Sequence, residues 1–310
     1  MKPKLGCSVE AGRSLPEAVE RARAAERLGY DSIWSSQLPG SRDTALVLAA
    51  YAQATERVRL GTAVLPIYTR HPTAMAQMAM TLDELSGGRF ILGLGVSHQV
   101  TVESMWGLRL ENPVVAMREY LTILRASFRE GAADQAGRHF SAHWGYTAPR
   151  NGELPIYIAA LGEHMLQLAG ELADGVSLWM CPPGYVREVV VPQVRAGRER
   201  AGKPLEGFDI MAVVPVSLAA EPQKARDAFR ETVKRYAGLP FYRKVLDSSG
   251  FAEELARDQV SERAVDELAG IGDAAAVQGA IARYREAGVT LPVAGPTGSF
   301  DATIQAAAGA

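Results

Sequence analysis

Ser97 and His98 are the adjacent residues best suited to proton transfer, because they follow a glycine-rich apolar stretch at 89–95. Imidazole gives or takes a proton near neutral pH, and a hydroxyl group donates or accepts a hydrogen bond. The stretch is too short for a helix and follows Gly87-Gly88, so it predicts a buried strand. Glycines near its end indicate a group packed closely against the backbone. We therefore predict a site for chemistry at the end of this strand; a core strand that ends in a Ser-His turn is the alternative.

Predicted strands alternate with predicted helices along the rest of the chain. Short apolar runs predict strands at 5–9, 31–36, 58–64, 89–95, 156–160, 175–180, 208–218 and 289–294. Apolar residues at helical spacing predict helices at 14–28, 43–55, 71–85, 113–129, 163–172, 185–201, 222–238 and 273–287. Two segments interrupt this pattern: 130–155, which has no clear period, and 239–271, which contains a predicted acidic helix at 252–257.

The alternation predicts an α/β fold with a parallel sheet and right-handed crossovers. Eight such units in a chain of 310 residues are typical of a (β/α)8 TIM barrel. We expect a single domain over residues 1–310, with insertions near 130–155 and 239–271. An open doubly wound sheet is the alternative, and it is disfavoured because no GxGxxG motif follows the first strand.

The composition is that of an ordinary globular protein, with 47% hydrophobic residues, 22% charged residues and a formal net charge of -2. This charge gives no electrostatic reason to expect nucleic acid or an anionic membrane as a partner. No apolar run has transmembrane length and the first residues lack a signal-peptide core, so we expect a cytoplasmic protein. Cys7 and Cys181 are far apart and predict neither a disulfide framework nor a metal site.

In a TIM barrel the chemistry lies at the carboxyl ends of the strands. Those ends supply mostly apolar and aromatic side chains with few polar groups: Ser8, Glu10, Trp34, Ser36, Gln37, Ala63, Val64, Pro66, Ser97, His98, Ala160, Gly162, Trp179, Met180 and Cys181. They include no carboxylate pair of the kind that glycosidases use, and no HxH or HExxH motif for a metal. No GxSxG motif frames Ser97, which argues against a serine nucleophile. Such a pocket suggests that a bound cofactor carries the reaction.

The turn after the predicted strand at 156–160 is a candidate anion site. Small residues end this strand, and Gly162 opens directly into a helix. The free amide groups at a helix start attract anions, and small residues allow a phosphate to approach closely. Glu163 would oppose an anion unless its side chain points away, and a tight turn without a ligand is the alternative.

Four motifs together resemble the luciferase-like monooxygenase superfamily: LGTAVLPIYTRHP at 60–72, LSGGRFILGLGVSH at 85–98, GRHF at 137–140 and AALGEHMLQLAGELADG at 159–175. More narrowly, they are similar to its actinobacterial branch that uses the deazaflavin coenzyme F420. The resemblance covers about half of the chain. It implies a TIM barrel with an insertion region and a flavin or deazaflavin bound at the carboxyl face.

The resemblance also implies roles for individual residues. The 60–72 motif implies a cis peptide between Ala63 and Val64, in a bulge behind the cofactor ring, and residues 160–163 match the cofactor-phosphate segment. The residues that we expect to bind the cofactor are Ser36, Ala63, Val64, Pro66, Gly95, Ser97, Ala160, Leu161, Gly162, Glu163 and Met180. His98 stands where sugar-phosphate dehydrogenases of the family have an acidic residue for proton transfer. Gln37 and Leu38 replace an Asp-His pair of those enzymes.

We therefore expect a coenzyme F420-dependent oxidoreductase that transfers a hydride between the deazaflavin and a small organic substrate. His98 would move the proton, and Gln37 and Ser97 would donate hydrogen bonds. Because Leu38 cannot act as a base, reduction of an activated C=C or C=N bond is favoured over alcohol oxidation. The alternatives are an FMN-dependent monooxygenase of the same superfamily and a cofactor-binding paralogue without turnover. Apolar surface on the early helices would suit a homodimer.

Overall fold

The computed structural model describes residues 3–309. Within this range, eight parallel strands form a closed barrel, in the order β1 (Gly6–Ser8), β2 (Ser32–Ser35), β3 (Arg59–Thr62), β5 (Phe90–Gly95), β8 (Ile156–Ala159), β9 (Gly175–Leu178), β10 (Asp209–Leu218) and β12 (Leu291–Pro296). Strand β12 also pairs with β1, with Val293 opposite Gly6, and this pairing closes the barrel. The predicted TIM barrel is confirmed.

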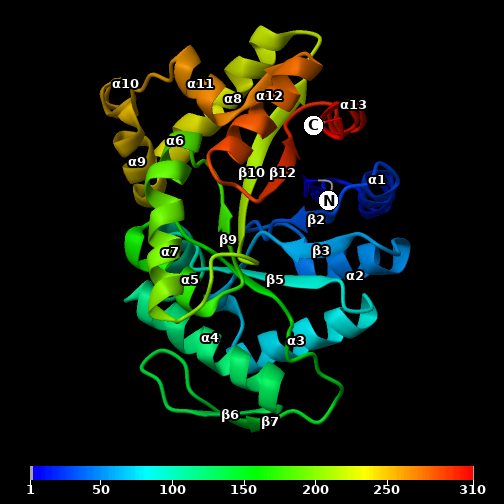
Figure 1. Cartoon of the computed structure of the whole chain (residues 1–310), viewed down its shortest axis with the longest axis vertical. Helices are drawn as coiled ribbons and strands as arrows, with labels where there is room; N and C mark the ends of the chain where they lie inside the picture. Colours follow the sequence, from blue (N-terminus) through cyan, green and yellow to red (C-terminus); the bar gives the residue numbers. More distant parts are fainter. Residues whose placement is uncertain (1–2, 310) are drawn as a thin grey trace.

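Helices surround the barrel as a ring (Figure 1): α1 (Leu15–Arg27), α2 (Thr44–Ala54), α3 (Pro72–Leu85), α4 (Pro113–Glu130), α5 (Glu163–Leu172), α7 (Val191–Arg200), α8 (Pro222–Ala237), α12 (Ala274–Glu286) and α13 (Phe300–Ala307). Local signals set several of their starts. The side chain of Ser14 accepts a hydrogen bond from the amide of Glu17, and Asp43 accepts hydrogen bonds from the first turn of α2. The main hydrophobic core fills the space between strands and helices.

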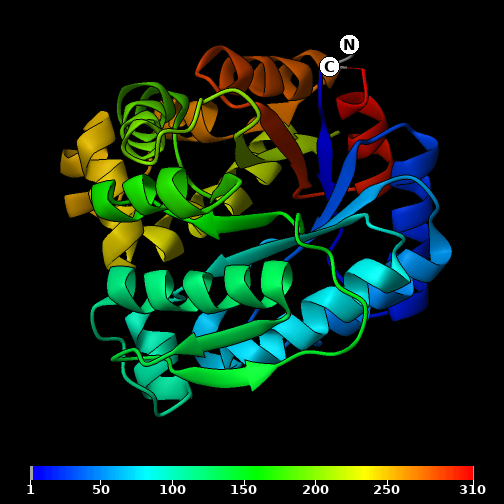
Figure 2. The ribbon, with the colours of Figure 1, turned by 60° about the horizontal axis from the view of Figure 1, so that its bottom comes forward.

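The first interruption contains a hairpin that the sequence did not predict. Strands β6 (Ala132–Gln135) and β7 (Ala142–Gly145) pair in antiparallel fashion and lie outside α4 (Figure 2). The Glu119 side chain of α4 accepts hydrogen bonds from the backbone amides of Arg138, His139 and Phe140. Because a contact with α4 holds the hairpin loop, the segment needs no periodic pattern of its own.

The second interruption is more regular than expected. It contains α9 (Pro240–Leu246), α10 (Ala252–Ala256), α11 (Glu262–Leu268) and the short strand β11 (Gly270–Gly272), which pairs with β10. The predicted acidic helix corresponds to α10. A second hydrophobic cluster, which includes Phe229, Phe251 and Val265, holds these helices together. In Figure 1 they project from the upper left of the barrel.

The predicted helix at 185–201 is divided. A short α6 (Pro183–Tyr185) passes through a π-helical segment, Val186–Val190, into α7. Among the described residues, no helix combines the length and apolar composition needed to cross a bilayer. The same residues contain no group of three or more His, Cys, Asp and Glu side chains arranged to hold a metal ion.

Candidate active site

The glycines of β5 allow the end of β3 to lie directly against it. A Cβ atom on Gly93 would lie 2.9 Å from the carbonyl carbon of Thr62 and nearer still to its oxygen. The Thr62 hydroxyl accepts a hydrogen bond from the Gly93 amide and donates one to the Gly93 carbonyl, each 2.8 Å long. The expectation of a group packed closely against this backbone is therefore confirmed, and the group is the neighbouring strand.

The segment after β3 forms the predicted bulge. The Ala63–Val64 peptide bond is cis, as the resemblance implied. The next residues form the short strand β4 (Leu65–Pro66), in which Pro66 lies opposite Gly95. A Cβ atom on Gly95 would lie 2.6 Å from Cγ2 of Val64. Four predicted cofactor-binding residues, Ala63, Val64, Pro66 and Gly95, thus lie together at the carboxyl end of β5.

Ser97 and His98 follow β5 at the mouth of the barrel. Ser97 has a φ of 60°, a left-handed conformation that non-glycine residues adopt mainly at special positions. His98 is half-buried, and its Nδ1 atom is buried without a hydrogen-bond partner among residues 3–309. Burial lowers the pKa of His98 from 6.5 because it penalises the charged form. The imidazole is therefore neutral at pH 7, so its pKa is not the unperturbed value that the sequence alone suggested.

Two further strand ends leave polar atoms without partners. Tyr68 follows β4 and Trp179 follows β9, and both side chains are half-buried. The Tyr68 hydroxyl and Trp179 Nε1, like His98 Nδ1, are buried without a hydrogen-bond partner in the described part of the chain. Buried polar atoms in proteins are nearly always hydrogen-bonded. These three atoms follow carboxyl strand ends, where a TIM barrel binds its ligands, and they are candidates for ligand contacts.

Glu10 is a functional candidate that the sequence reasoning recorded but did not select. Its carboxylate accepts hydrogen bonds from the Ser36 amide at 3.1 Å, the Ser36 hydroxyl at 2.9 Å and the Ser8 hydroxyl at 3.1 Å. Burial raises the pKa of Glu10 above 4.5, and these hydrogen bonds oppose that shift. Ser36, a predicted cofactor contact, is thereby fixed by a carboxyl group from β1. The sequence signal that could have identified Glu10 is its position as an acidic residue two positions after Ser8, at the end of the first strand.

A neutral side chain at position 10 should stabilise the protein at neutral pH. Because the folded state raises the pKa of Glu10, stability falls as pH rises from 4.5 through the folded-state pKa. We expect Glu10→Gln, which keeps an acceptor for Ser36, to melt about 2–4 °C higher at pH 7.5, the shift that about 1 kcal/mol produces in a large domain. Thermal denaturation between pH 4 and 8 measures this difference, which should disappear near pH 4. A lower Tm for Glu10→Gln at pH 7.5 would contradict a costly buried charge; exposed Glu253→Gln serves as the control.

Gln37 follows β2, and its side chain is hydrogen-bonded to the loop that leads to α2. Its Oε1 accepts a hydrogen bond from the Thr44 amide at 2.9 Å, and its Nε2 donates one to the Arg42 carbonyl at 3.3 Å. The side chain therefore holds the loop between β2 and α2. Leu38 beside it is exposed, with 51% of its surface accessible.

The turn at Ala160–Glu163 has the predicted form. Gly162 caps α5 with an extended backbone, and a Cβ atom there would meet nothing within 4 Å. The Leu161 carbonyl accepts a hydrogen bond from the Tyr185 hydroxyl at 2.8 Å, which holds the turn against α6. Glu163 is exposed and receives a hydrogen bond from Gln167 one turn further along α5. Open space therefore lies next to the free amide groups at the start of α5.

Met180, also predicted to bind the cofactor, differs from the other residues. Its φ of 50° is left-handed, like that of Ser97. Its side chain, however, is only 1% exposed and belongs to the second hydrophobic cluster. The Met180 side chain therefore packs in the second hydrophobic cluster and not beside Val64 and Gly95.

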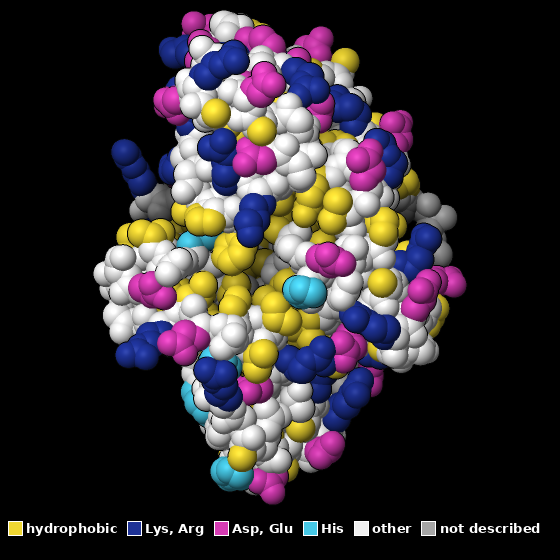
Figure 3. Space-filling model, turned by 90° about the vertical axis from the view of Figure 1, so that its left-hand side faces the viewer, with side chains coloured by type: hydrophobic (Ala, Val, Ile, Leu, Met, Phe, Trp, Pro, Cys, Tyr) yellow, Lys and Arg dark blue, Asp and Glu magenta, His cyan; other side chains and the backbone are white. Residues whose placement is uncertain are grey.

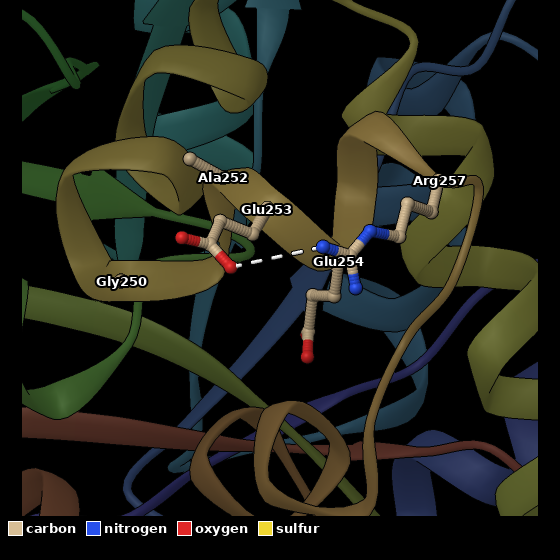
Figure 4. A pocket seen from close by; sticks show the side chains of 5 residues that line it. All are labelled: Gly250, Ala252, Glu253, Glu254 and Arg257. Carbon is tan, nitrogen blue, oxygen red and sulfur yellow. Dashed lines mark ion pairs between the residues drawn. The ribbon is translucent and has the colours of Figure 1, made fainter.

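Two other hollows lie outside the barrel mouth. One is formed by α10 and its neighbours, where Glu253 and Arg257 pair with each other at 4.0 Å (Figure 4). The other lies at the amino ends of the strands, around Lys4, Glu26 and Arg57. The amino face of a TIM barrel serves stability rather than chemistry, and the polar groups beside α10 are satisfied by each other. The strand ends around Val64, Gly95 and His98 remain the candidate active site.

Comparisons with known proteins show the family of the chain. A family model described as luciferase-like monooxygenase matches residues 1–291. A 5,10-methylenetetrahydromethanopterin reductase from Methanolobus tindarius is 34% identical over 207 residues, which are 67% of this chain and 63% of that protein. The match thus spans less than two thirds of that relative. A putative coenzyme F420-dependent oxidoreductase from Mycobacterium tuberculosis is 31% identical over 311 residues, with 88% of this chain and 89% of that protein covered.

A solved structure is similar over nearly the whole chain. The coenzyme F420 dependent tetrahydromethanopterin reductase from Methanopyrus kandleri superposes with a TM-score of 0.85 at 25% sequence identity, covering 99% of this chain and 98% of that one. The family match, the barrel and the bulge at Ala63–Val64 all agree with the family that the sequence motifs resemble. The chain belongs to the luciferase-like monooxygenase family.

Proposed function

We propose that the protein is a coenzyme F420-dependent oxidoreductase that transfers a hydride between the deazaflavin and a small organic molecule. The observation that carries this proposal is the packing of Val64 against Gly95 at the carboxyl end of β5, together with the unpartnered polar atoms that follow β4, β5 and β9. Relatives named for reactions with F420 support the choice of cofactor. The FMN-dependent monooxygenase is the second candidate, because the family description itself names monooxygenases.

The residues present fit such a cofactor. Val64, Pro66 and Gly95 would back its ring, and Ser36 and Ser97 would border it. The turn at Ala160–Glu163 would hold its phosphate, since small residues and free helix amides suit an anion. The open space at Gly162 supports this assignment, and the Glu163 carboxylate accepts a hydrogen bond from Gln167, one turn further along α5.

Filling the space at Gly162 should weaken cofactor binding. Gly162→Val places a branched side chain in the space assigned to the phosphate, and we expect the Kd for F420 to rise at least about tenfold, which corresponds to about 1.4 kcal/mol. Quenching of protein fluorescence during titration with F420 measures this change. Gly145→Val in the β6–β7 hairpin is the matched control and should bind normally. An unchanged Kd in Gly162→Val would show that the phosphate binds elsewhere.

His98 is the residue that we propose for proton transfer. When bound, reduced F420 supplies a hydride to one atom of the substrate double bond, so the other atom of that bond needs a proton. The neutral imidazole takes a proton from water through its free lone pair, and the imidazolium so formed would give that proton to the substrate. Burial lowers the pKa of this imidazolium, which makes it a stronger acid.

We propose that the hydride passes from reduced F420 to the substrate, in the reduction of an activated C=C or C=N bond. Gln37 is hydrogen-bonded within its loop and Leu38 is apolar, so these two residues do not supply the base that the Asp-His pair of the sugar-phosphate dehydrogenases would supply for alcohol oxidation. Anaerobic mixing of the enzyme and reduced F420 with an enone or an imine, followed at the absorbance of oxidised F420, tests this proposal. We expect oxidation of F420 with these substrates; turnover only with secondary alcohols and oxidised F420 would reverse the proposed direction. No turnover with either set, despite tight F420 binding, would favour a paralogue without catalysis.

We further propose a homodimer in the cytoplasm. Helix α2 is apolar on nearly all sides, and Leu46 on it is 72% exposed, while Leu85 at the end of α3 is 43% exposed. A homodimer would cover these exposed leucines. Cys7 and Cys181 are both free, as suits a reducing compartment. Sedimentation velocity tests the dimer, and a monomer at micromolar concentration would contradict it.

A further inference from the structure

We propose that the substrate is a planar, uncharged molecule with a hydrogen-bond acceptor, bound against an aromatic row formed by His98, Tyr242, Tyr236 and Trp179. This inference rests on the proposed function, because it concerns the substrate of that same site. Tyr236 in α8 and Tyr242 in α9 would select the chemical class of that substrate.

The aromatic row joins two barrel strands to two helices beyond them. The ring centroids of His98 and Tyr242 lie 5.5 Å apart, those of Tyr242 and Tyr236 lie 4.9 Å apart, and those of Tyr236 and Trp179 lie 5.7 Å apart. His98 follows β5 and Trp179 follows β9, whereas Tyr236 lies in α8 and Tyr242 in α9. The two ends of the row are therefore fixed by the barrel, and its centre is supplied by the helices that cover it.

The row forms the partly open edge of the second hydrophobic cluster. Trp179, Tyr236 and Tyr242 pack against the buried residues of that cluster, yet each remains half-buried. Burial raises the pKa of the Tyr242 phenol, which keeps this group neutral. Aromatic faces that are half-covered by a core present a flat apolar surface, on which planar ligands stack well.

The unpartnered polar atoms of the row favour a ligand that carries a hydrogen-bond acceptor. Trp179 Nε1 and His98 Nδ1 are both buried without a partner in the described residues, and they belong to the two ends of the row. Indole nitrogen can only donate a hydrogen bond. A carbonyl oxygen or an imine nitrogen on the substrate would satisfy it, and the same group activates an adjacent double bond toward hydride.

The charges beside the row argue against an anionic substrate. Arg243 in α9 is paired with Asp247 at 2.7 Å, and the Arg235 guanidinium lies 5.6 Å from the ring centroid of Tyr236. Both arginines are therefore already engaged, which leaves Lys244 as the one cation of α9 without an ion pair among residues 3–309. The side of the molecule toward which β5 points in Figure 2 is hollowed near its centre, with hydrophobic side chains inside and charged ones around them (Figure 3). A phosphorylated sugar would need free cations there.

Calorimetric titration of the protein with coumarin, a planar lactone with an activated double bond, tests this proposal. The titration is made with and without bound F420. We expect wild-type protein to bind coumarin and not glucose 6-phosphate. Trp179→Phe, which keeps a ring but loses the donor, should weaken coumarin binding about tenfold, and Tyr236→Leu should weaken it as well. Trp144→Phe is the matched control, because Trp144 Nε1 donates to Ser127 in the hairpin region, and it should bind normally.

The outcomes separate this inference from the proposed function. Coumarin binding that is lost in the row variants while F420 binding persists would support the inference. Coumarin binding unaffected by both Trp179→Phe and Tyr236→Leu, or preference for glucose 6-phosphate, would overturn it. If F420 itself does not bind, the proposed function fails, but coumarin titration of the cofactor-free protein still decides whether the row binds planar molecules.

Discussion

Replacement of His98 by alanine should lower kcat by about 100- to 10,000-fold, the usual contribution of general acid–base catalysis. This corresponds to about 3–5 kcal/mol of barrier. His98 is half-buried at the end of β5 and has an Nδ1 atom without a partner, so its removal leaves the cofactor segments intact. The Kd for F420 should therefore change far less than kcat. Steady-state kinetics and fluorescence titration on the same preparation separate the two effects.

Two comparisons make the His98 result specific. His98→Gln keeps polar hydrogen bonding but cannot carry a proton, so it should stay as slow as His98→Ala. His143→Ala in the exposed hairpin removes a histidine paired with Asp134 and should be fully active. In the wild type, the rate of reduction should fall as pH rises through the pKa of His98, which burial places below 6.5, because the imidazolium form gives the proton. Turnover within about threefold of wild type in both His98 variants would make His98 a packing residue.

Gly93→Ala should destabilise the protein by about 3 kcal/mol or more, at the upper end for overpacking of a core. The new Cβ atom would overlap the backbone carbonyl of Thr62, and a strand backbone held by hydrogen bonds on both sides cannot move away as a side chain can. Thermal denaturation should show a fall in Tm of roughly 6–12 °C, or the variant should fail to fold. Gly162→Ala, where a Cβ atom meets open space, should melt within about 2 °C of wild type. Equal Tm values for Gly93→Ala and wild type would mean that β3 and β5 are not packed as described.

The barrel could be predicted because its signals are local. Short apolar runs specify the strands, and capping residues such as Ser14 and Asp43 mark helix starts within a few residues of sequence. The elements that were missed depend on distant contacts. The hairpin loop is held by Glu119, and β11 consists of Gly270, Ile271 and Gly272, whose composition carries no strand pattern. Helix α13 was hidden by its many alanines, although Thr303 and Ile304 within it are buried.

The same division holds for the candidate site. Glycines in β5 predicted close packing, because a glycine within a strand allows another backbone to come near. The resemblance of the 60–72 motif to the family implied the cis peptide. The burial of Glu10 could not be predicted, since it depends on Ser36 from the next strand. The lowered pKa of His98 likewise follows from its burial at the barrel mouth, close to Tyr242 in α9, which is far away in sequence.

Equilibrium titration of the purified protein with F420 and, separately, with FMN tests the central proposal most directly. Binding is followed by quenching of tryptophan emission, and wild-type protein is compared with Gly162→Val. We predict that F420 binds at micromolar concentration or tighter, that FMN binds at least about tenfold more weakly, and that Gly162→Val loses F420 affinity. Tighter binding of FMN than of F420 would instead favour the monooxygenase, and binding of neither would contradict a cofactor site at the carboxyl ends of the strands.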